Sequence, residues 1–168
     1  MLLKWIGAVL IFAGCGSCGF AVARNFRREE RILHQLKRML DTMINELNCR
    51  RSSLPQLFRV AAGLGGELSP LAKSMAQELE QQIAPDAASC MAVVLGKQRL
   101  PDRVKELLYI LGGSLGSYDL EGQLRELGSV SARCSRILDE IADSRDERIR
   151  TYQTLGLCAG AAIAILLI

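Results

Sequence analysis

The sequence predicts an all-α protein, and three observations lead to that prediction. Apolar residues recur every three or four positions over long stretches, most clearly between Leu120 and Ile141, and this spacing places them on one face of a helix. Only 4 prolines occur in 168 residues, and the long helical periods leave little room for strands. Both ends of the chain are apolar. We therefore expect one compact helical bundle held between two membrane segments.

Composition argues against several functions. The formal net charge is +3 and 5% of residues are aromatic, which is too little of either for nucleic-acid binding. The six cysteines are isolated or lie in apolar segments, so we expect free thiols in a cytosol-facing domain. Cys15-x-x-Cys18 resembles a redox or metal motif, but no nearby His or carboxylate completes it. We expect no metal and no cofactor.

The first apolar segment is assigned as a transmembrane helix within residues 1–23. Trp5 to Ala23 is uncharged and about 28 Å long as a helix, close to the thickness of a bilayer core. Lys4 precedes it, whereas six basic residues follow, so the following domain is expected in the cytoplasm. A lipoprotein signal peptide is the alternative, because Phe12 to Cys15 resembles its cleavage site.

Residues 24–151 are expected to form six cytoplasmic helices. The first runs from Arg27 to Asn48, with Pro55 then lying in the first turn of a short helix that ends at Gly63. The apolar stripe of the first helix is wide enough to face two partners. It consists of Ile32, Leu33, Leu36, Met39, Leu40, Met43, Ile44 and Leu47.

The third and fourth helices begin at capping residues. Ser69 is expected to be the N-cap of the third helix, with Pro70 at its first position. Apolar residues at steps of four line this helix, namely Leu71, Met75, Leu79 and Ile83. Asp86 caps the fourth helix, Ala87 to Leu95.

The fifth helix starts at Leu100-Pro101-Asp102, loosens at Gly112-Gly113 and ends at Gly116. Asp119 then caps the longest helix. Its apolar seam consists of Leu120, Leu124, Leu127, Ser131, Cys134, Leu138 and Ile141. No charged residue follows Arg150, so we expect this helix to continue into a membrane segment, residues 152–168. Short connections favour antiparallel neighbours.

Residues typical of catalysis are scarce. His34 is the single histidine and lies among basic residues, and no Ser, Cys or Asp constellation accompanies it. The glycine run 112–116 lacks the Lys-Ser/Thr ending of a phosphate loop. We predict that the protein is not an enzyme. An enzyme with a site of scattered polar residues is the alternative.

Basic charge is concentrated at the start of the predicted domain. Residues 24–51 carry 8 basic and 4 acidic side chains, whereas residues 52–150 carry 12 and 14. We predict that five basic residues bind an acidic partner surface: Arg31, Lys37, Arg38, Arg50 and Arg51. The alternative is contact with anionic membrane lipid.

Small residues line one face of each apolar end. Gly156, Gly160 and Ala164 recur every four residues, and Gly14 and Cys18 have the same spacing in the first segment. Small residues at this spacing let membrane helices approach closely. We predict that the two segments pack on each other through this face.

The order of these features resembles a known family. The matching segments are Arg28, Arg31 and Gln35-Leu36-Lys37-Arg38, then Ser52 to Pro55, Leu115-Gly116, and Tyr152-x-x-Leu155-Gly156 before the apolar tail. Together they resemble stage III sporulation protein AB of endospore-forming bacteria, over nearly the whole chain.

The resemblance implies a membrane platform. The family acts in the mother-cell inner membrane, in the channel complex that links this cell to the forespore. Its cytoplasmic domain is similar to the F-type platform protein of type II secretion, which lies between a cytoplasmic ATPase and the membrane machinery. The partners we expect are other channel proteins including that ATPase, membrane lipid and, as an open alternative, further copies of the chain. A membrane-anchored helical adaptor unrelated to sporulation is the other reading.

Overall fold

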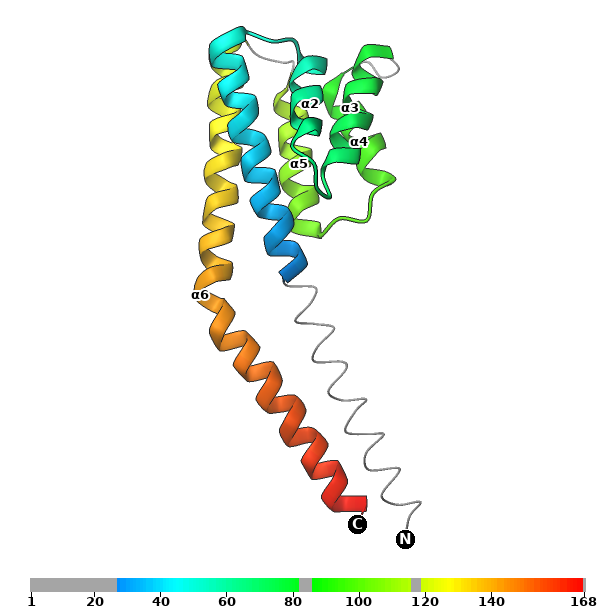
Figure 1. Ribbon diagram of the computed structural model, residues 1–168, viewed down its shortest axis with the longest axis vertical. Helices are drawn as coiled ribbons and strands as arrows, with labels where there is room; N and C mark the ends of the chain where they lie inside the picture. Colours follow the sequence, from blue (N-terminus) through cyan, green and yellow to red (C-terminus); the bar gives the residue numbers. More distant parts are fainter. Residues whose placement is uncertain (1–26, 82–85, 116–118, 168) are drawn as a thin grey trace. The chain divides into compact units, whose positions relative to one another are not determined.

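Every regular element in the described part of the chain is a helix, which confirms the all-α prediction. The computed structural model describes residues 27–81, 86–115 and 119–167. These ranges contain six helices (Figure 1): residues 27–50, α2 Leu54–Gly63, α3 Ser69–Gln81, α4 Ala87–Gly96, α5 Asp102–Ser114 and α6 Leu120–Leu167. Residues Glu29–Leu138 form one unit, called the bundle below. The described residues from Asp139 onward belong to a second unit.

The core of the bundle is apolar and draws on all six helices. Seven of the eight apolar residues predicted for the first stripe are buried, and the eighth, Ile44, is half-buried. The largest fully buried side chains elsewhere are Phe58, Leu57, Leu71, Met75, Met91, Leu95 and Leu107. Burying one such side chain contributes on the order of 2 kcal/mol. The helical periodicity of the sequence therefore identifies most of the core.

The 27–50 helix and the first part of α6 form an antiparallel pair (Figure 1). Lys37 Nζ donates a hydrogen bond to Ser135 Oγ at 2.8 Å, and one turn further along, Asp41 Oδ1 accepts one from Ser131 Oγ at 3.1 Å. Residue numbers rise on one helix as they fall on the other, which defines the antiparallel direction.

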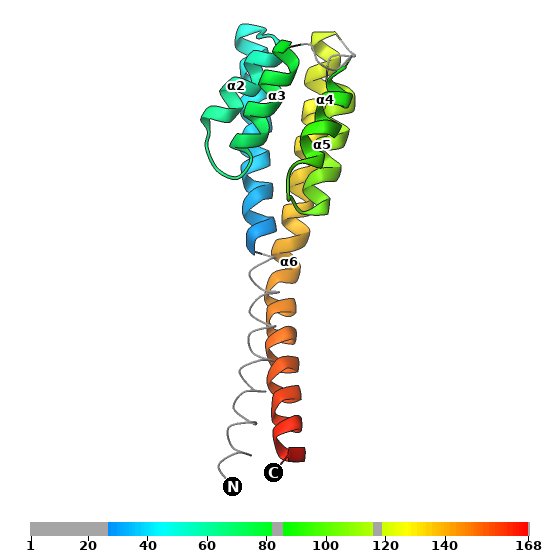
Figure 2. The ribbon, with the colours of Figure 1, turned by 90° about the vertical axis from the view of Figure 1, so that its right-hand side faces the viewer.

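The four shorter helices pack in sequence order, α2 against α3, α3 against α4 and α4 against α5. Figure 2 shows α2 with α3 on one side of the bundle and α4 with α5 on the other. An ion pair between Arg59 and Glu80 joins α2 to α3. The turn between these helices contains Gly65 and Gly66, both with positive φ, a conformation that glycine adopts without steric cost.

Two expected helix boundaries are wrong. Ser69 is the first residue of α3, and its hydroxyl donates to the Ala62 carbonyl of α2 at 2.8 Å. It therefore fastens α3 to α2 instead of capping it. α5 ends at Ser114 and not at Gly116, and Gly112 is buried within the helix. A Cβ on Gly112 would lie 2.6 Å from the Met91 Cβ. The glycine thus serves close packing of α5 on α4, not loosening of the helix.

Three other details of α6 emerge from the structure. Asp119 Oδ1 accepts from the Gly122 amide at 3.0 Å, as expected of a capping residue. The predicted seam is buried in its middle, whereas Leu120, Leu124 and Ile141 are half-buried, and Val130, which the prediction omitted, is buried. In the buried middle of the seam, Ser131 and Cys134 contact Asp41 and Leu33 of the 27–50 helix.

The apolar ends of the chain are described only in part. α6 runs without a break into residues 152–167, so the predicted continuity of the last bundle helix with the apolar tail is confirmed. Among the described residues, no helix has the length and apolar character needed to cross a membrane. The predicted transmembrane helix within residues 1–23, and the lipoprotein alternative, lie outside the described residues.

Candidate interaction surfaces

The five basic residues predicted to bind a partner lie at separate places on the 27–50 helix. Arg31 and Arg38 are exposed and two turns apart on its outer face. Lys37 lies between them but is half-buried, and its ammonium group is directed to Ser135 of α6. Arg50 and Arg51 are at the end of the helix. The structure therefore contains two exposed basic pairs instead of one cluster of five.

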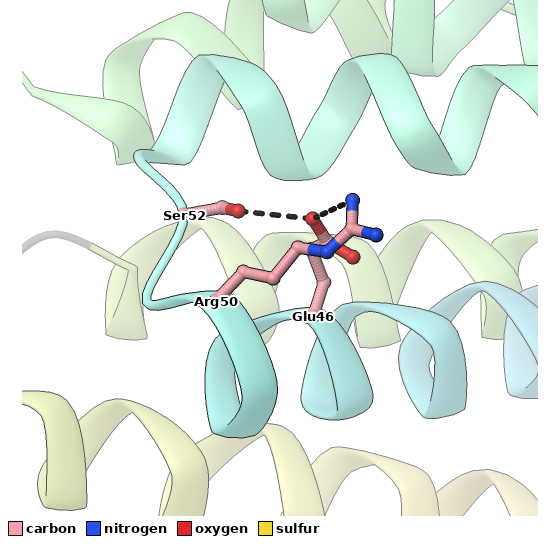
Figure 3. Close-up of polar contacts among 3 residues, drawn as sticks. All are labelled: Glu46, Arg50 and Ser52. Carbon is pink, nitrogen blue, oxygen red and sulfur yellow. Dashed lines mark hydrogen bonds and ion pairs between the residues drawn. The ribbon is translucent and has the colours of Figure 1, made fainter.

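The turn after the 27–50 helix is held by Glu46 (Figure 3). Its Oε1 accepts a hydrogen bond from Ser52 Oγ at 3.0 Å and lies 3.6 Å from Arg50 Nη1. The Glu46 side chain is 13% exposed and that of Arg50 is 73% exposed. Part of the Arg50 charge is thus compensated within the turn. Because the pair is solvent-exposed on one side, it contributes less than about 1 kcal/mol.

Arg51 has a backbone conformation that is unusual for a residue with a side chain. Its φ is 49°, and its N–H donates to the Leu47 carbonyl at 3.2 Å. This arrangement closes the helix end, a position where glycine is common. A non-glycine residue in this region carries about 1 kcal/mol of strain. Strained positions of this kind are concentrated at functional sites, which makes Arg51 a candidate for function.

Gln35 is a candidate residue whose contact the sequence did not reveal. Its Oε1 accepts a hydrogen bond from the Glu67 backbone N–H at 2.9 Å. A Cβ on Gly66, where φ is 86°, would lie 2.6 Å from the same oxygen. Gln35 therefore fixes the α2–α3 turn against the 27–50 helix, and only glycine fits beneath it. The signals available in the sequence were the Gln35-Leu36 pattern and the Gly65-Gly66 pair.

The thiols of the bundle differ in environment. Cys134 is fully buried and its Sγ donates to the Leu33 carbonyl at 3.4 Å. Burial raises the pKa of the Cys134 thiol to about 11, so it stays protonated and unreactive near neutral pH. Cys90 is also buried, whereas Cys49 is exposed, and all three are free. Within the described ranges, no group of His, Cys, Asp and Glu could hold a metal ion.

The small residues of the predicted membrane face are described in part. Gly156, Gly160 and Ala164 lie on the helical backbone of α6 at successive four-residue intervals. Gly14 and Cys18, their predicted partners, lie outside the described residues. The predicted packing between these two faces therefore stays a prediction.

The fold and the positions of its candidate residues define a class, that of helical-bundle domains whose candidate binding groups lie on helix surfaces and turns. The chain belongs to the stage III sporulation protein AB family, whose family model matches residues 4–168. The resemblance inferred from the order of motifs is thereby confirmed, and a role in sporulation follows. An adaptor unrelated to sporulation no longer needs to be considered.

A comparison with solved structures gives the same fold. A structure described as stage III sporulation protein AB (SpoIIIAB) matches with a TM-score of 0.61 and 16% sequence identity. The match covers 71% of this chain and 98% of that chain. At this identity the likeness concerns the fold alone. No curated protein matches the chain.

Proposed function

We propose that this protein is a non-catalytic platform component of the sporulation channel between mother cell and forespore, and that it docks a cytoplasmic ATPase to the membrane machinery. The observation that carries the proposal is the family match. It extends from residue 4 to residue 168, so the bundle and both apolar ends belong to one family unit. A helical bundle with an apolar segment at each end is suited to hold partners at a membrane.

The polar contacts of the bundle support docking over catalysis. The Lys37–Ser135 and Asp41–Ser131 hydrogen bonds join two helices. The bond from the Glu67 amide to Gln35 joins a helix to a turn. These side chains are used to maintain the shape of the bundle, and a rigid shape with charged outer faces is what a docking platform needs.

The proposed location is the mother-cell inner membrane, with the main domain, residues 24–151, in the cytoplasm. Six basic residues follow the first apolar segment and Lys4 alone precedes it. This asymmetry favours a cytoplasmic position for the domain. It is the sequence, not the described structure, that supports this part of the proposal.

In the same proposal the two apolar ends pack on each other in the bilayer. Gly156, Gly160 and Ala164 would face Gly14 and Cys18, because small residues four positions apart allow close approach of helix backbones. Gly160→Leu should block that approach and reduce cross-linking between Cys158 and Cys18. Unchanged cross-linking and unchanged sporulation in this variant would reject the packing.

Deletion and complementation in sporulating cells test the proposed function. Cells without the protein should complete engulfment and then arrest, and the full chain should restore heat-resistant spores. A chain in which an unrelated transmembrane helix replaces residues 1–23 should also restore them, whereas a chain lacking residues 1–23 should not. Full spore formation by cells that lack the protein, or by cells with the unanchored chain, would contradict the proposal.

A further inference from the structure

The exposed arginines of the bundle differ in their carboxylate contacts. Four have a carboxylate oxygen within 4.0 Å, in the pairs Arg50–Glu46, Arg59–Glu80, Arg103–Glu29 and Arg133–Glu106. Arg31, Arg38, Arg51, Arg125 and Arg136 are also exposed. No carboxylate of the described residues forms an ion pair with any of these five. Three of the five, Arg31, Arg38 and Arg136, lie where the 27–50 helix and α6 run side by side.

Arg31, Arg38 and Arg136 lie on two neighbouring antiparallel helices. Arg31 and Arg38 are seven residues apart on the 27–50 helix, about 10 Å along its axis. Arg136 directly follows Ser135, the residue of α6 that binds Lys37. It therefore lies level with Lys37 on the neighbouring helix, whose axis is about 8–10 Å away.

Arg38 and Arg136 each point away from a buried residue of their own helix. Arg38 follows the buried Leu36 by two residues, and Arg136 follows the buried Cys134 by two, which is about 200° around each helix. The outer surface of this helix pair thus carries three arginines, which we call the arginine face.

The size of the arginine face indicates the kind of partner that it fits. Arg31 and Arg38 are about 10 Å apart along one helix, and Arg136 lies on a neighbouring helix whose axis is about 8–10 Å away. A single phosphate or carboxylate cannot reach groups so far apart, whereas acidic residues at intervals of three, four and seven along one helix can. Guanidinium groups bind carboxylates well, because their planar fork donates two parallel hydrogen bonds.

The position of Asp41 favours a protein as the partner of the arginine face over a lipid surface. Asp41 is exposed one turn beyond Arg38 and accepts only the Ser131 hydroxyl among the described contacts. A uniformly anionic lipid surface would repel this carboxylate, whereas a protein can place a basic or neutral side chain opposite it. Mixed charge at the edge of a basic face is what electrostatic matching between two proteins requires.

We propose that the arginine face is an interaction surface for an acidic helix of a partner protein, with Arg31, Arg38 and Arg136 as its anchoring residues. The proposal deepens the platform function and rests on it for the existence of a protein partner. It differs from the sequence-based grouping in two ways. Lys37 is excluded, because it binds Ser135 between the two helices. Arg136, a residue of α6 distant in sequence, is included.

Cross-linking in sporulating cells tests this surface in the full chain. A photo-crosslinking amino acid replaces His34, which is exposed between Arg31 and Arg38. Mass spectrometry then identifies the attached molecule. We expect a peptide of one protein rich in Asp and Glu, with its yield reduced at least about tenfold by combined Arg31→Glu, Arg38→Glu and Arg136→Glu changes.

The matched control reverses three lysines elsewhere in the bundle, with the changes Lys73→Glu, Lys97→Glu and Lys105→Glu. This variant has the same net charge and should keep the cross-link. Combined Arg31→Lys, Arg38→Lys and Arg136→Lys changes keep the charge but lose the guanidinium fork, so they should reduce the cross-link less than the changes to Glu do. Equal thermal midpoints of these variants and the original chain show that loss does not arise from misfolding. Cross-links to phospholipid or to a neutral or basic peptide, or equal loss in both charge-reversed variants, would overturn the proposal.

Spore counts separate this inference from the platform function. If the protein is needed for sporulation but the arginine variant forms spores as well as the control does, the arginine face is wrong and the platform function stands. If cells that lack the protein form spores normally, the platform function itself is wrong.

Discussion

Lys37 on the 27–50 helix binds Ser135 on α6 through a 2.8 Å hydrogen bond. This contact connects residues 98 positions apart in sequence and aligns the outer faces of two helices. Lys37, which was predicted to bind a partner, is thus used for contact between two helices of the bundle. The same contact places Arg136 level with Lys37 on the neighbouring helix. The stability of this helix pair is therefore a condition for the proposed docking.

The first prediction concerns this hydrogen bond. Ser135→Ala should lower the free energy of unfolding by about 1 kcal/mol, because Lys37 loses its acceptor. Ser129→Ala is the control, since the Ser129 hydroxyl binds only the Glu126 carbonyl of its own helix. Thermal unfolding of both variants in detergent measures the difference. Equal midpoints would mean that the Lys37–Ser135 bond contributes nothing to stability.

A second prediction separates two adjacent glycines of α5. Gly112→Ala should destabilise the bundle by about 1–3 kcal/mol, because its Cβ would overlap the Met91 side chain. Gly113→Ala should be neutral or stabilising by up to about 1 kcal/mol, since no atom lies within 4 Å of that added Cβ. Unfolding midpoints report both effects. A Gly112→Ala variant as stable as Gly113→Ala would argue against close packing of α4 on α5.

The third prediction tests the strain at Arg51. Arg51→Gly should stabilise the protein by about 0.5–1 kcal/mol relative to Arg51→Ala, because glycine accepts a φ of 49° without a steric penalty. Both variants lose the same charge, so their difference isolates the backbone. If the glycine variant unfolds at a lower temperature than the alanine variant, Arg51 is not strained.

The fourth prediction follows from the buried thiol of Cys134. Its pKa is raised from 9.0 to about 11, mainly by burial. Between these values an unfolded chain has released the proton and the folded chain has kept it. Stability should therefore be highest below about pH 9 and decrease as the pH rises toward 11. Cys134→Ala should flatten that part of the curve, and an unchanged slope in this variant would contradict the assignment.

Thiol modification near neutral pH provides an independent check of the same environment. A maleimide should modify the exposed Cys49 rapidly and should modify the buried Cys134 only after unfolding. Labelling of both at the same rate in the folded protein would show that the helix pair opens readily.

The sequence predicts the helices well because their order is encoded in local patterns. Apolar spacing located the 27–50 helix, Pro55 and Gly63 bounded α2, and Asp86 capped α4 through the Ser89 amide at 2.8 Å. Each of these signals acts within a few residues. The predicted family was likewise readable from the order of short motifs.

Features that depend on which helices meet could not be predicted in this way. The role of Gly112 requires knowledge that Met91 lies opposite it. The Ser69 hydroxyl has a neighbouring helix as its partner. Arg136 joins the surface of Arg31 and Arg38 only through the antiparallel pairing of helices far apart in sequence. The residue type alone shows that a side chain could cap a helix or carry a charge. Which role the side chain has in the folded protein depends on its tertiary contacts.

Co-purification from membranes of sporulating cells is the most direct test of the central claim, that the protein docks a cytoplasmic ATPase to the membrane machinery. The tagged full chain should sediment with the membrane fraction and recover the ATPase together with other channel proteins. The variant with Arg31, Arg38 and Arg136 reversed to Glu should recover less ATPase, and the lysine control should recover as much as the original. Absence of the ATPase from material that contains the intact chain and other channel proteins would contradict the claim.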